Sequence, residues 1–288
     1  MNSVPFDFFH SVTRYCNTKA LDSCRELHGL VGAASAETIE KLAYERIEIK
    51  NGKLGVIDYR YRHNENRRAS ICPHDKWYTA FNFVGAEEEH SVEPKAINAF
   101  KAHRNTPNVS LSFDTSTLSQ EIIESIKSLQ YVTCIRLSTR AGKLIPQLMR
   151  NFVPKRTIVE LLFEFEYVYD FDDATATLLL DLIKQEQFYY LRLPEDSHLM
   201  LKKIVAEWKV APKTFTGKCI FNALLDIHPS YVNGVQEGKI RACTVEEKRF
   251  LEMYYPDEDS EKFLISKNKK GNAIYWTQVQ GLIYLLFP

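Results

Sequence analysis

The sequence has no excess of charge of either sign. Its 288 residues hold 37 lysines and arginines against 37 aspartates and glutamates, and the sequence pI is about 7.1. Proteins that bind nucleic acid over a broad surface usually carry a basic surplus. The balance argues against that function, and we expect no nucleic-acid partner. A composition of 45% apolar and 26% charged residues is typical of a soluble globular protein with one large domain or two ordinary ones.

Long apolar runs and a secretory leader are also missing. The apolar run at residues 282–287 is far shorter than the roughly 20 residues that a membrane helix needs. Asp7 interrupts the first apolar stretch and no basic leader precedes it, so we expect no signal peptide. The six cysteines form no C-x-x-C pair and follow no zinc or disulfide spacing. We therefore expect buried, reduced thiols in a cytoplasmic or nuclear protein with no membrane partner.

Convincing catalytic motifs are absent as well. No glycine-rich phosphate turn follows any expected strand, which weighs against a nucleotide-binding fold. His63-Asn64-Glu65 matches half of a zinc deaminase signature, but Cys72-Pro73 has the reversed order and no second cysteine. The acidic run at residues 170–173 could hold Mg²⁺, although carboxylates between a strand and a helix more often cap the helix, which we prefer. We expect no enzyme activity, no cofactor and no metal.

The sequence does contain strand signals in its first half. Residues 44–49 and 56–61 alternate with period two on either side of Asn51-Gly52. Asn-Gly between such runs predicts a two-residue hairpin, because a type I′ turn needs positive φ at both central residues. We interpret residues 77–84 as a further strand and residues 63–70 as a polar loop.

The second half alternates strand-like and helix-like segments. Strand-like runs begin at residues 109, 132, 158 and 188, which are 23 to 30 residues apart. The helix-like segments are 118–129, 143–151, 174–185 and 197–208, and a further strand is expected around 214–221. This alternation predicts parallel β/α units, and we favour an irregular leucine-rich-repeat-like solenoid over a doubly wound sheet. Residues 263–266 and 273–276 predict a C-terminal β-hairpin cap.

The amino terminus combines a proline with apolar residues at helical spacing. Phe8, Val12 and Tyr15 fall on one face of an expected helix, and Pro5 suits its first turn. A second, leucine-spaced helix is expected after a polar break. A helix pair of this size cannot hold its own core, so its apolar face must meet the rest of the chain or a partner.

These residues together resemble a divergent F-box, and the layout that follows is similar to that of nematode F-box-like proteins. The resemblance covers about residues 3–35 and is carried by Val4, Pro5, Phe8, Val12, Leu21, Leu27 and Leu30. The F-box family uses a Leu-Pro-like start and leucine-spaced helices to bind the adaptor subunit of cullin-RING ubiquitin ligases. The resemblance implies that these residues contact the adaptor and that the remainder of the chain selects a target.

The expected organisation has three parts: an F-box-like helical segment at 1–43, a hairpin-rich linker region at 44–105, and the leucine-rich-repeat-like array with its cap at 106–288. Alternate strand residues of an array face its open surface, where exposed tyrosines make strong contacts. The candidate partner-binding residues are Tyr167, Tyr169 and Tyr189. We expect non-enzymatic protein binding, within a ubiquitin ligase or as a stand-alone module, and an α/β-fold enzyme is the remaining alternative.

Overall fold

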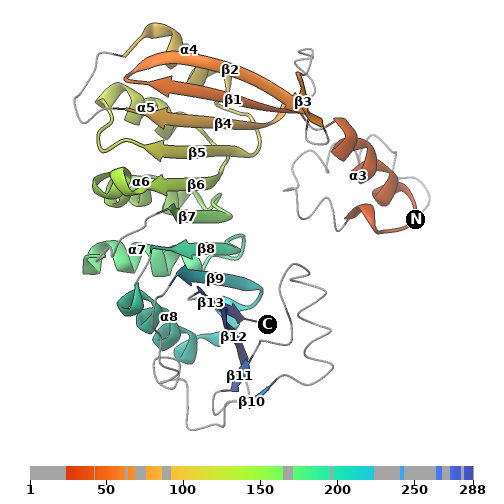
Figure 1. The fold of residues 1–288 in the computed structure, drawn as a ribbon, viewed down its shortest axis with the longest axis vertical. Helices are drawn as coiled ribbons and strands as arrows, with labels where there is room; N and C mark the ends of the chain where they lie inside the picture. The colour runs from red at the N-terminus through yellow and green to blue at the C-terminus, as the bar shows by residue number, and fades with distance from the viewer. Residues whose placement is uncertain are drawn as a thin grey trace. The chain divides into compact units, whose positions relative to one another are not determined.

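The computed structural model describes residues 24–41, 43–61, 64–68, 76–85, 92–164, 171–194, 197–223, 241–242, 264–267, 273–279 and 282–287 (Figure 1). The chain divides into two compact units, Met1–Ile135 and Arg136–Pro288, and the boundary falls inside strand β6 (Val132–Ser138). Both units combine parallel strands with helices, so the α/β class expected from the sequence is confirmed. The three-part division proposed above stays a prediction.

The sheet of unit 1 has the strand order β5-β4-β1-β2-β3. Strands β1, β4 and β5 run parallel, whereas β2 and β3 pair antiparallel beside β1. The strands are β1 (Ala43–Lys50), β2 (Lys53–Tyr61), β3 (Asn64–Arg68), β4 (Lys76–Val84) and β5 (Val109–Asp114). The helices are α3 (Leu30–Lys41), α4 (Pro94–Ala102) and α5 (Gln120–Ser128).

The β1–β2 hairpin confirms the strongest local prediction. Lys50 pairs with Lys53 across a two-residue turn in which Asn51 and Gly52 have φ values of 51° and 75°. Both values are positive, as a type I′ turn requires. The loop expected at residues 63–70 is wrong in part, because Asn64–Arg68 form β3 beside β2. This strand is polar throughout, so it has no alternation of apolar residues from which it could be predicted.

Phenylalanine rings hold helix α4 on the sheet of unit 1. Phe100 of α4 stacks on Phe81 and Phe83 of β4, with ring centroids 4.6 and 5.9 Å apart. Phe83 also stacks on Phe113 of β5 at 4.7 Å, and all four side chains are buried. Each such pair adds about 1 kcal/mol beyond its burial. These contacts show that Phe81 and Phe83 point toward the helices, so the alternate residues of β4 point to the opposite face.

The sheet of unit 2 has the strand order β10-β11-β12-β13-β9-β8-β7. Strands β7, β8 and β9 run parallel and the remaining pairs are antiparallel. The strands are β7 (Glu160–Glu164), β8 (Tyr190–Leu193), β9 (Lys218–Ala223), β10 (Arg241–Ala242), β11 (Leu264–Lys267), β12 (Ala273–Val279) and β13 (Leu282–Phe287). The helical segments are η1 (Thr139–Leu144), α6 (Ile145–Phe152), η2 (Val153–Lys155), α7 (Asp173–Ile183), α8 (His198–Val210) and η3 (Pro212–Phe215).

Helices α7 and α8 lie against one face of the unit 2 strands. Trp208 of α8 contacts Phe287 of β13, with ring centroids 6.3 Å apart. Lys218 pairs with Phe287 in the β9–β13 register and therefore points to the same face. Its ammonium group donates hydrogen bonds to the carbonyls of Gln185 and Phe188, just after α7. Helix α7 packs against both α6 and α8, so these helices form one layer.

The expected elements of the second half are found close to their predicted positions. The four predicted strands correspond to β5, β6, β7 and β8, and the helices to α5, α6, α7 and α8. The hairpin at the carboxyl terminus is confirmed by β11 and β12, which pair Leu264 with Trp276. The strand expected around 214–221 begins only at Lys218, because Pro212–Phe215 form η3.

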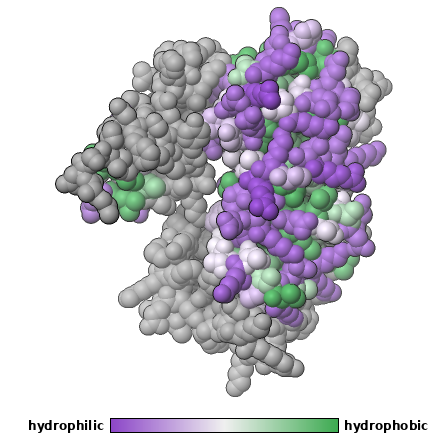
Figure 2. Space-filling model, turned by 180° about the vertical axis from the view of Figure 1, so that it is seen from behind, coloured by the Kyte–Doolittle hydropathy of each residue, from purple (hydrophilic) through white to green (hydrophobic). Residues whose placement is uncertain are grey.

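The described surface is polar where the molecule is seen from behind. Figure 2 shows mostly hydrophilic residues there, with separate apolar patches between them. Amphipathic helices produce such a surface when their apolar stripes are buried against a sheet. Within the described segments, no helix has the length and apolar character needed to cross a membrane.

Candidate binding face of the strands

The candidate site lies on the second face of the unit 2 strands. Side chains alternate between the two faces of a strand, and α7 and α8 lie on the Phe287 side. Leu285 lies two residues before Phe287 and therefore points to the same side. Leu191 and Ile220 align with Leu285 and share that side, so the residues next to them along β8 and β9 point away from the helices. We call the set of residues on this second face the strand face; its two aligned rows are Glu160, Tyr190 and Cys219, followed by Leu162, Arg192 and Phe221.

Arg192 is the chemically most informative side chain of the strand face. Its guanidinium carbon lies 5.4 Å from the centroid of the Phe221 ring, which is a cation–π contact. The ring restricts the guanidinium plane, so its hydrogen-bond donors are preorganised for a carboxylate or a carbonyl of a partner. Leu162 aligns with Arg192 on the neighbouring strand. Phe221 is buried and supports the guanidinium, whereas Arg192 and Leu162 are half-buried and can contact a partner. Arginine beside apolar groups is typical of the residues that dominate protein–protein binding energy.

Acidic residues flank this group along β7. Glu160 and Glu164 share a face with Leu162, because residues two apart on a strand point the same way, and Glu164 is exposed. A complementary partner must therefore satisfy a guanidinium and carboxylates within a short distance, which favours a polypeptide of mixed charge. Within the described residues, no group of three or more His, Cys, Asp and Glu side chains could hold a metal ion.

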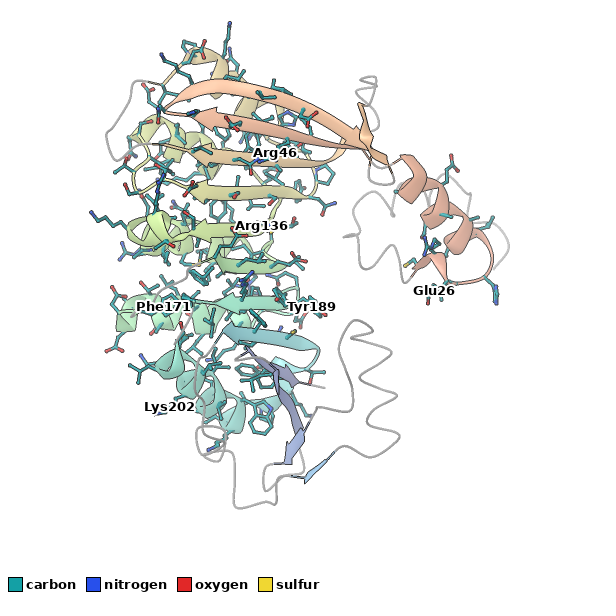
Figure 3. All side chains as sticks on the ribbon, in the orientation of Figure 1. Glu26, Arg46, Arg136, Phe171, Tyr189 and Lys202 are labelled. Carbon is teal, nitrogen blue, oxygen red and sulfur yellow. The ribbon has the colours of Figure 1, made fainter. Side chains whose placement is uncertain are left out.

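Unit 1 presents a corresponding face with smaller side chains. On the face of β4 and β5 opposite α4, Arg46 aligns with Ala80 and Ser110 in the parallel register of β1, β4 and β5. Arg46, which Figure 3 labels, is exposed. No aromatic residue stands in this aligned set, so Arg46 has no counterpart there of the buried Phe221 ring that supports Arg192.

The sequence-predicted candidates are only partly within the described residues. Those that lie outside them are Val4, Pro5, Phe8, Val12, Leu21, Tyr167 and Tyr169. Tyr189 is half-buried and directly precedes β8 (Figure 3). Its N–H donates to the carbonyl of Val159 at 2.8 Å, and its own carbonyl accepts from the N–H of Cys219 at 2.9 Å. Tyr189 thus joins three neighbouring chain segments at the beginning of the parallel strands.

The two remaining candidates lie at the beginning of α3. Leu27 is 55% exposed and Leu30, the first residue of α3, is 50% exposed. Gly32 is required beside them, because a Cβ atom at this position would overlap the carbonyl oxygen of Leu27. The close approach fixes the segment that bears Leu27 against the first turn of the helix, with both leucines in contact with solvent.

Arg192, Phe221 and Leu162 were not among the predicted site residues. Leu191 and Leu193 are both buried, and strand alternation from these two leucines would have selected Tyr190 and Arg192 for the opposite face. Phe221 carried no comparable signal, because the run from Cys219 to Phe221 is apolar at every position.

The acidic run before α7 has a structural role at its described residues. Asp172 caps the helix, and its carboxylate accepts a hydrogen bond from the N–H of Thr175 at 2.7 Å. This hydrogen bond, aided by the Thr175 side chain, lowers the pKa of Asp172. Asp173 forms an ion pair with Lys203 of α8 at 2.7 Å. The preferred capping interpretation is therefore confirmed for Asp172.

Comparison with known proteins does not assign the chain to a family. No protein-family model matches the chain, and no curated protein matches it. The F-box resemblance stays a prediction that rests on the quoted residues.

Proposed function

We propose that this chain is a non-enzymatic protein-binding protein that recognises a partner polypeptide through the strand face of unit 2. The observation that carries the proposal is the guanidinium of Arg192 held 5.4 Å from the Phe221 ring and aligned with Leu162. A preorganised guanidinium between apolar groups loses little conformational freedom when it binds, which strengthens association. Binding alone needs no nucleophile, cofactor or metal, so we expect no catalysis by the chain itself.

We infer that the strands and helices form an irregular leucine-rich-repeat-like array. The order β9-β8-β7 supports it, because strands that follow one another in sequence are neighbours in the sheet. Among the described residues of unit 2, α6, α7 and α8 lie in one layer, which also supports it, since a doubly wound sheet has helices on both faces. Strand β13 and the antiparallel strands beyond it adjoin β9, as expected of a cap that ends the array.

We further propose that the protein acts as a substrate-recognition subunit of a cullin-RING ubiquitin ligase. Two features support this: the F-box-like residues of the amino terminus, and the exposure of Leu27 and Leu30, three residues apart at the beginning of α3. Large apolar side chains that lie exposed in one short segment can form a surface that a partner covers. In such an assembly the strand face would select the target, and the ligase would supply the ubiquitin-transfer chemistry.

Affinity capture with a matched pair of variants tests the recognition proposal. Arg192→Glu reverses the charge on the strand face, and Lys209→Glu makes the same change on an exposed lysine of α8. A polypeptide captured by the wild type should then be purified and titrated against each variant. We expect Arg192→Glu to weaken binding at least about ten-fold, equivalent to about 1.4 kcal/mol, and Lys209→Glu to leave it unchanged. Equal binding by both variants would refute the assignment.

A separate measurement tests the ligase proposal. The double variant Leu27→Asp with Leu30→Asp should lose binding to the purified adaptor subunit, whereas Leu199→Asp with Val210→Asp should keep it. Leu199 and Val210 are the matched controls, because they are exposed apolar residues of α8 at 55% and 78%. If the wild type does not bind the adaptor, the ligase proposal fails and the recognition proposal is unaffected.

A further inference from the structure

A second surface of unit 2 carries an unusual concentration of positive charge. The segment 139–156, which forms η1, α6 and η2, contains five basic residues and no acidic one, although the whole chain is balanced. The basic residues are Arg140, Lys143, Arg150, Lys155 and Arg156. A local field of one sign on a neutral protein concentrates ligands of the opposite sign at that place.

The geometry of the segment aligns most of this charge. Arg140 and Lys143 are three residues apart on a 3-10 helix, in which such residues eclipse one another. Arg150 follows seven residues after Lys143, close to two turns of an α-helix. Arg140, Lys143 and Arg150 are exposed, and the opposite side of α6 is buried through residues such as Leu148 and Phe152. Arg140, Lys143 and Arg150 therefore form one solvent-facing line, which we call the basic stripe.

Two ion pairs neutralise charges on the neighbouring helices α7 and α8, in contrast to the basic stripe. On α7 and α8, Lys203 pairs with Asp173 at 2.7 Å and Lys184 pairs with Glu207 at 2.6 Å. None of the three stripe residues forms an ion pair with any residue that the structure describes. The charge of Arg150 is felt at Asp172, where it adds to the hydrogen bonds from Thr175 that lower the pKa of that carboxyl.

The carboxyl end of the segment extends the positive surface. Lys155 lies over the ring of Phe152, with its ammonium nitrogen 5.0 Å from the centroid, and burial lowers the pKa of this lysine. Arg156 follows with φ of 55° and an exposed side chain. The left-handed residue ends the helical run, so Arg156 marks one end of the surface.

We propose that the basic stripe binds an acidic helical segment of a partner protein. The distance along the axis from Arg140 to Arg150 is about 17 Å at a rise of about 2.0 Å per residue in η1 and about 1.5 Å in α6. A partner helix of about 12 residues spans the same length. Glutamates three and four residues apart on that helix would present a matching line of carboxylates to the three cations.

A protein fits this surface better than a nucleic acid or a membrane. Asp172, which lies near enough to Arg150 for that charge to lower its pKa, and Asp181 of α7 are both exposed, and α7 packs against α6. A polyanion that crossed from α6 to α7 would therefore meet negative charge. Residues 140, 143, 147 and 150 include no aromatic side chain on which bases could stack, and no apolar side chain that could enter a bilayer. An acidic helix that lies along α6 faces the three cations of the basic stripe, and Asp172 lies near Arg150 at one end of the stripe.

Fluorescence anisotropy with a defined probe tests this proposal on the full chain. The probe is a labelled helical peptide of about 15 residues with glutamate at positions i, i+3, i+7 and i+10, and its control has glutamine at these positions. The variant pair is Arg140→Glu with Lys143→Glu, and the control pair is Lys209→Glu with Lys213→Glu, which makes the same change of charge on exposed residues of α8 and η3. Thermal melting of both double variants shows that each remains folded.

The proposal predicts that the wild type binds the glutamate peptide and that its Kd rises with salt concentration. The stripe variant should bind at least about ten-fold more weakly, whereas the control pair should stay within about two-fold. Equal binding of the glutamine peptide, an equal loss in the control pair, or absence of binding by the wild type would overturn it. Tighter binding of a single-stranded RNA oligonucleotide or of phosphatidylserine vesicles than of the peptide would also overturn it.

Discussion

Lys218 allows a quantitative test of how β9 is joined to the helical layer. The side chain is only 2% exposed, and its ammonium donates to the carbonyls of Gln185 at 2.7 Å and Phe188 at 2.8 Å. Burial lowers the pKa of Lys218 from 10.5 to about 8, although the carboxylate of Glu186 opposes the change. The folded protein therefore releases this proton at a lower pH than the unfolded chain does.

The sign of the pH dependence follows from the proton counts. Below pH 8 Lys218 is charged in both states, and the folded state bears the cost of the buried charge. Between pH 8 and 10.5 the unfolded chain binds more protons, so the free energy of unfolding rises with pH. At about 1.4 kcal/mol per pH unit, the contribution of Lys218 should grow by about 2 to 3 kcal/mol from pH 7 to pH 10.

Urea denaturation of the wild type and Lys218→Met at several pH values measures this contribution. The difference in unfolding free energy between the two proteins removes the titration of all other groups, and it should increase from pH 7 to pH 10 in favour of the wild type. Lys213→Met, at an exposed lysine of η3, controls for the loss of a lysine side chain as such. A flat difference would show that burial does not disfavour the charged form, and a difference that shrinks with pH would show that the folded state prefers it.

Four other side chains give independent tests of the packing. His103→Ala removes the imidazole that lies 3.0 Å from the buried carboxylate of Glu45. We expect the free energy of unfolding, measured by urea denaturation, to fall by about 3 kcal/mol and to recover in part when Glu45→Leu is added. No recovery would contradict the buried pair. Phe83→Ala removes two ring contacts and should cost about 4 kcal/mol in the same assay, and a cost below about 1 kcal/mol would refute the stack. Ser119→Ala should cost about 1 kcal/mol by loss of the α5 cap, whereas Ser119→Asp should retain stability, and thermal melting compares them. Asp172→Ala should lower Tm at pH 7. Because the pKa of Asp172 is lowered on folding, the contribution of Asp172 to stability is present above pH 3.8 and is lost as pH falls through the folded-state pKa. An equal Tm difference between variant and wild type at pH 7 and pH 2 would be inconsistent with the cap.

The parts of the fold that were predicted are those with a local physical cause. The turn between β1 and β2 was predicted because Asn51 and Gly52 tolerate positive φ. Helix α5 was predicted because Ile122 and Ile126 form an apolar stripe four residues apart, and both are buried. In each case the residues that decide the conformation lie within a few positions of one another.

Helix α4 was not expected, and the reason is its composition. Only Ala96 and Phe100 of its nine residues are buried, so its apolar stripe is short. The helix is held mainly by the rings of Phe81 and Phe83, which lie in the preceding strand β4. A contact of this kind depends on the tertiary fold and leaves no periodic pattern in the helix itself.

The strand face could be predicted only in part for a similar reason. Tyrosines near β8 were recognisable from the sequence, and the general idea of a partner-facing strand surface required only alternation. The contact between Arg192 and Phe221 joins residues 29 positions apart, and it depends on the parallel register of β8 and β9. That register is set by packing across the sheet, which no local pattern in either strand specifies.

Photo-crosslinking from single positions tests most directly whether the strand face is the surface that recognises other polypeptides. In one variant a photoreactive phenylalanine replaces Tyr190 on the strand face, and in the control variant it replaces Lys209 on α8. Cells that produce each variant are then irradiated. We predict a crosslinked product of defined mass from position 190 that excess wild-type protein suppresses and excess Arg192→Glu does not. A product from position 209 with none from position 190 would contradict binding through the strand face.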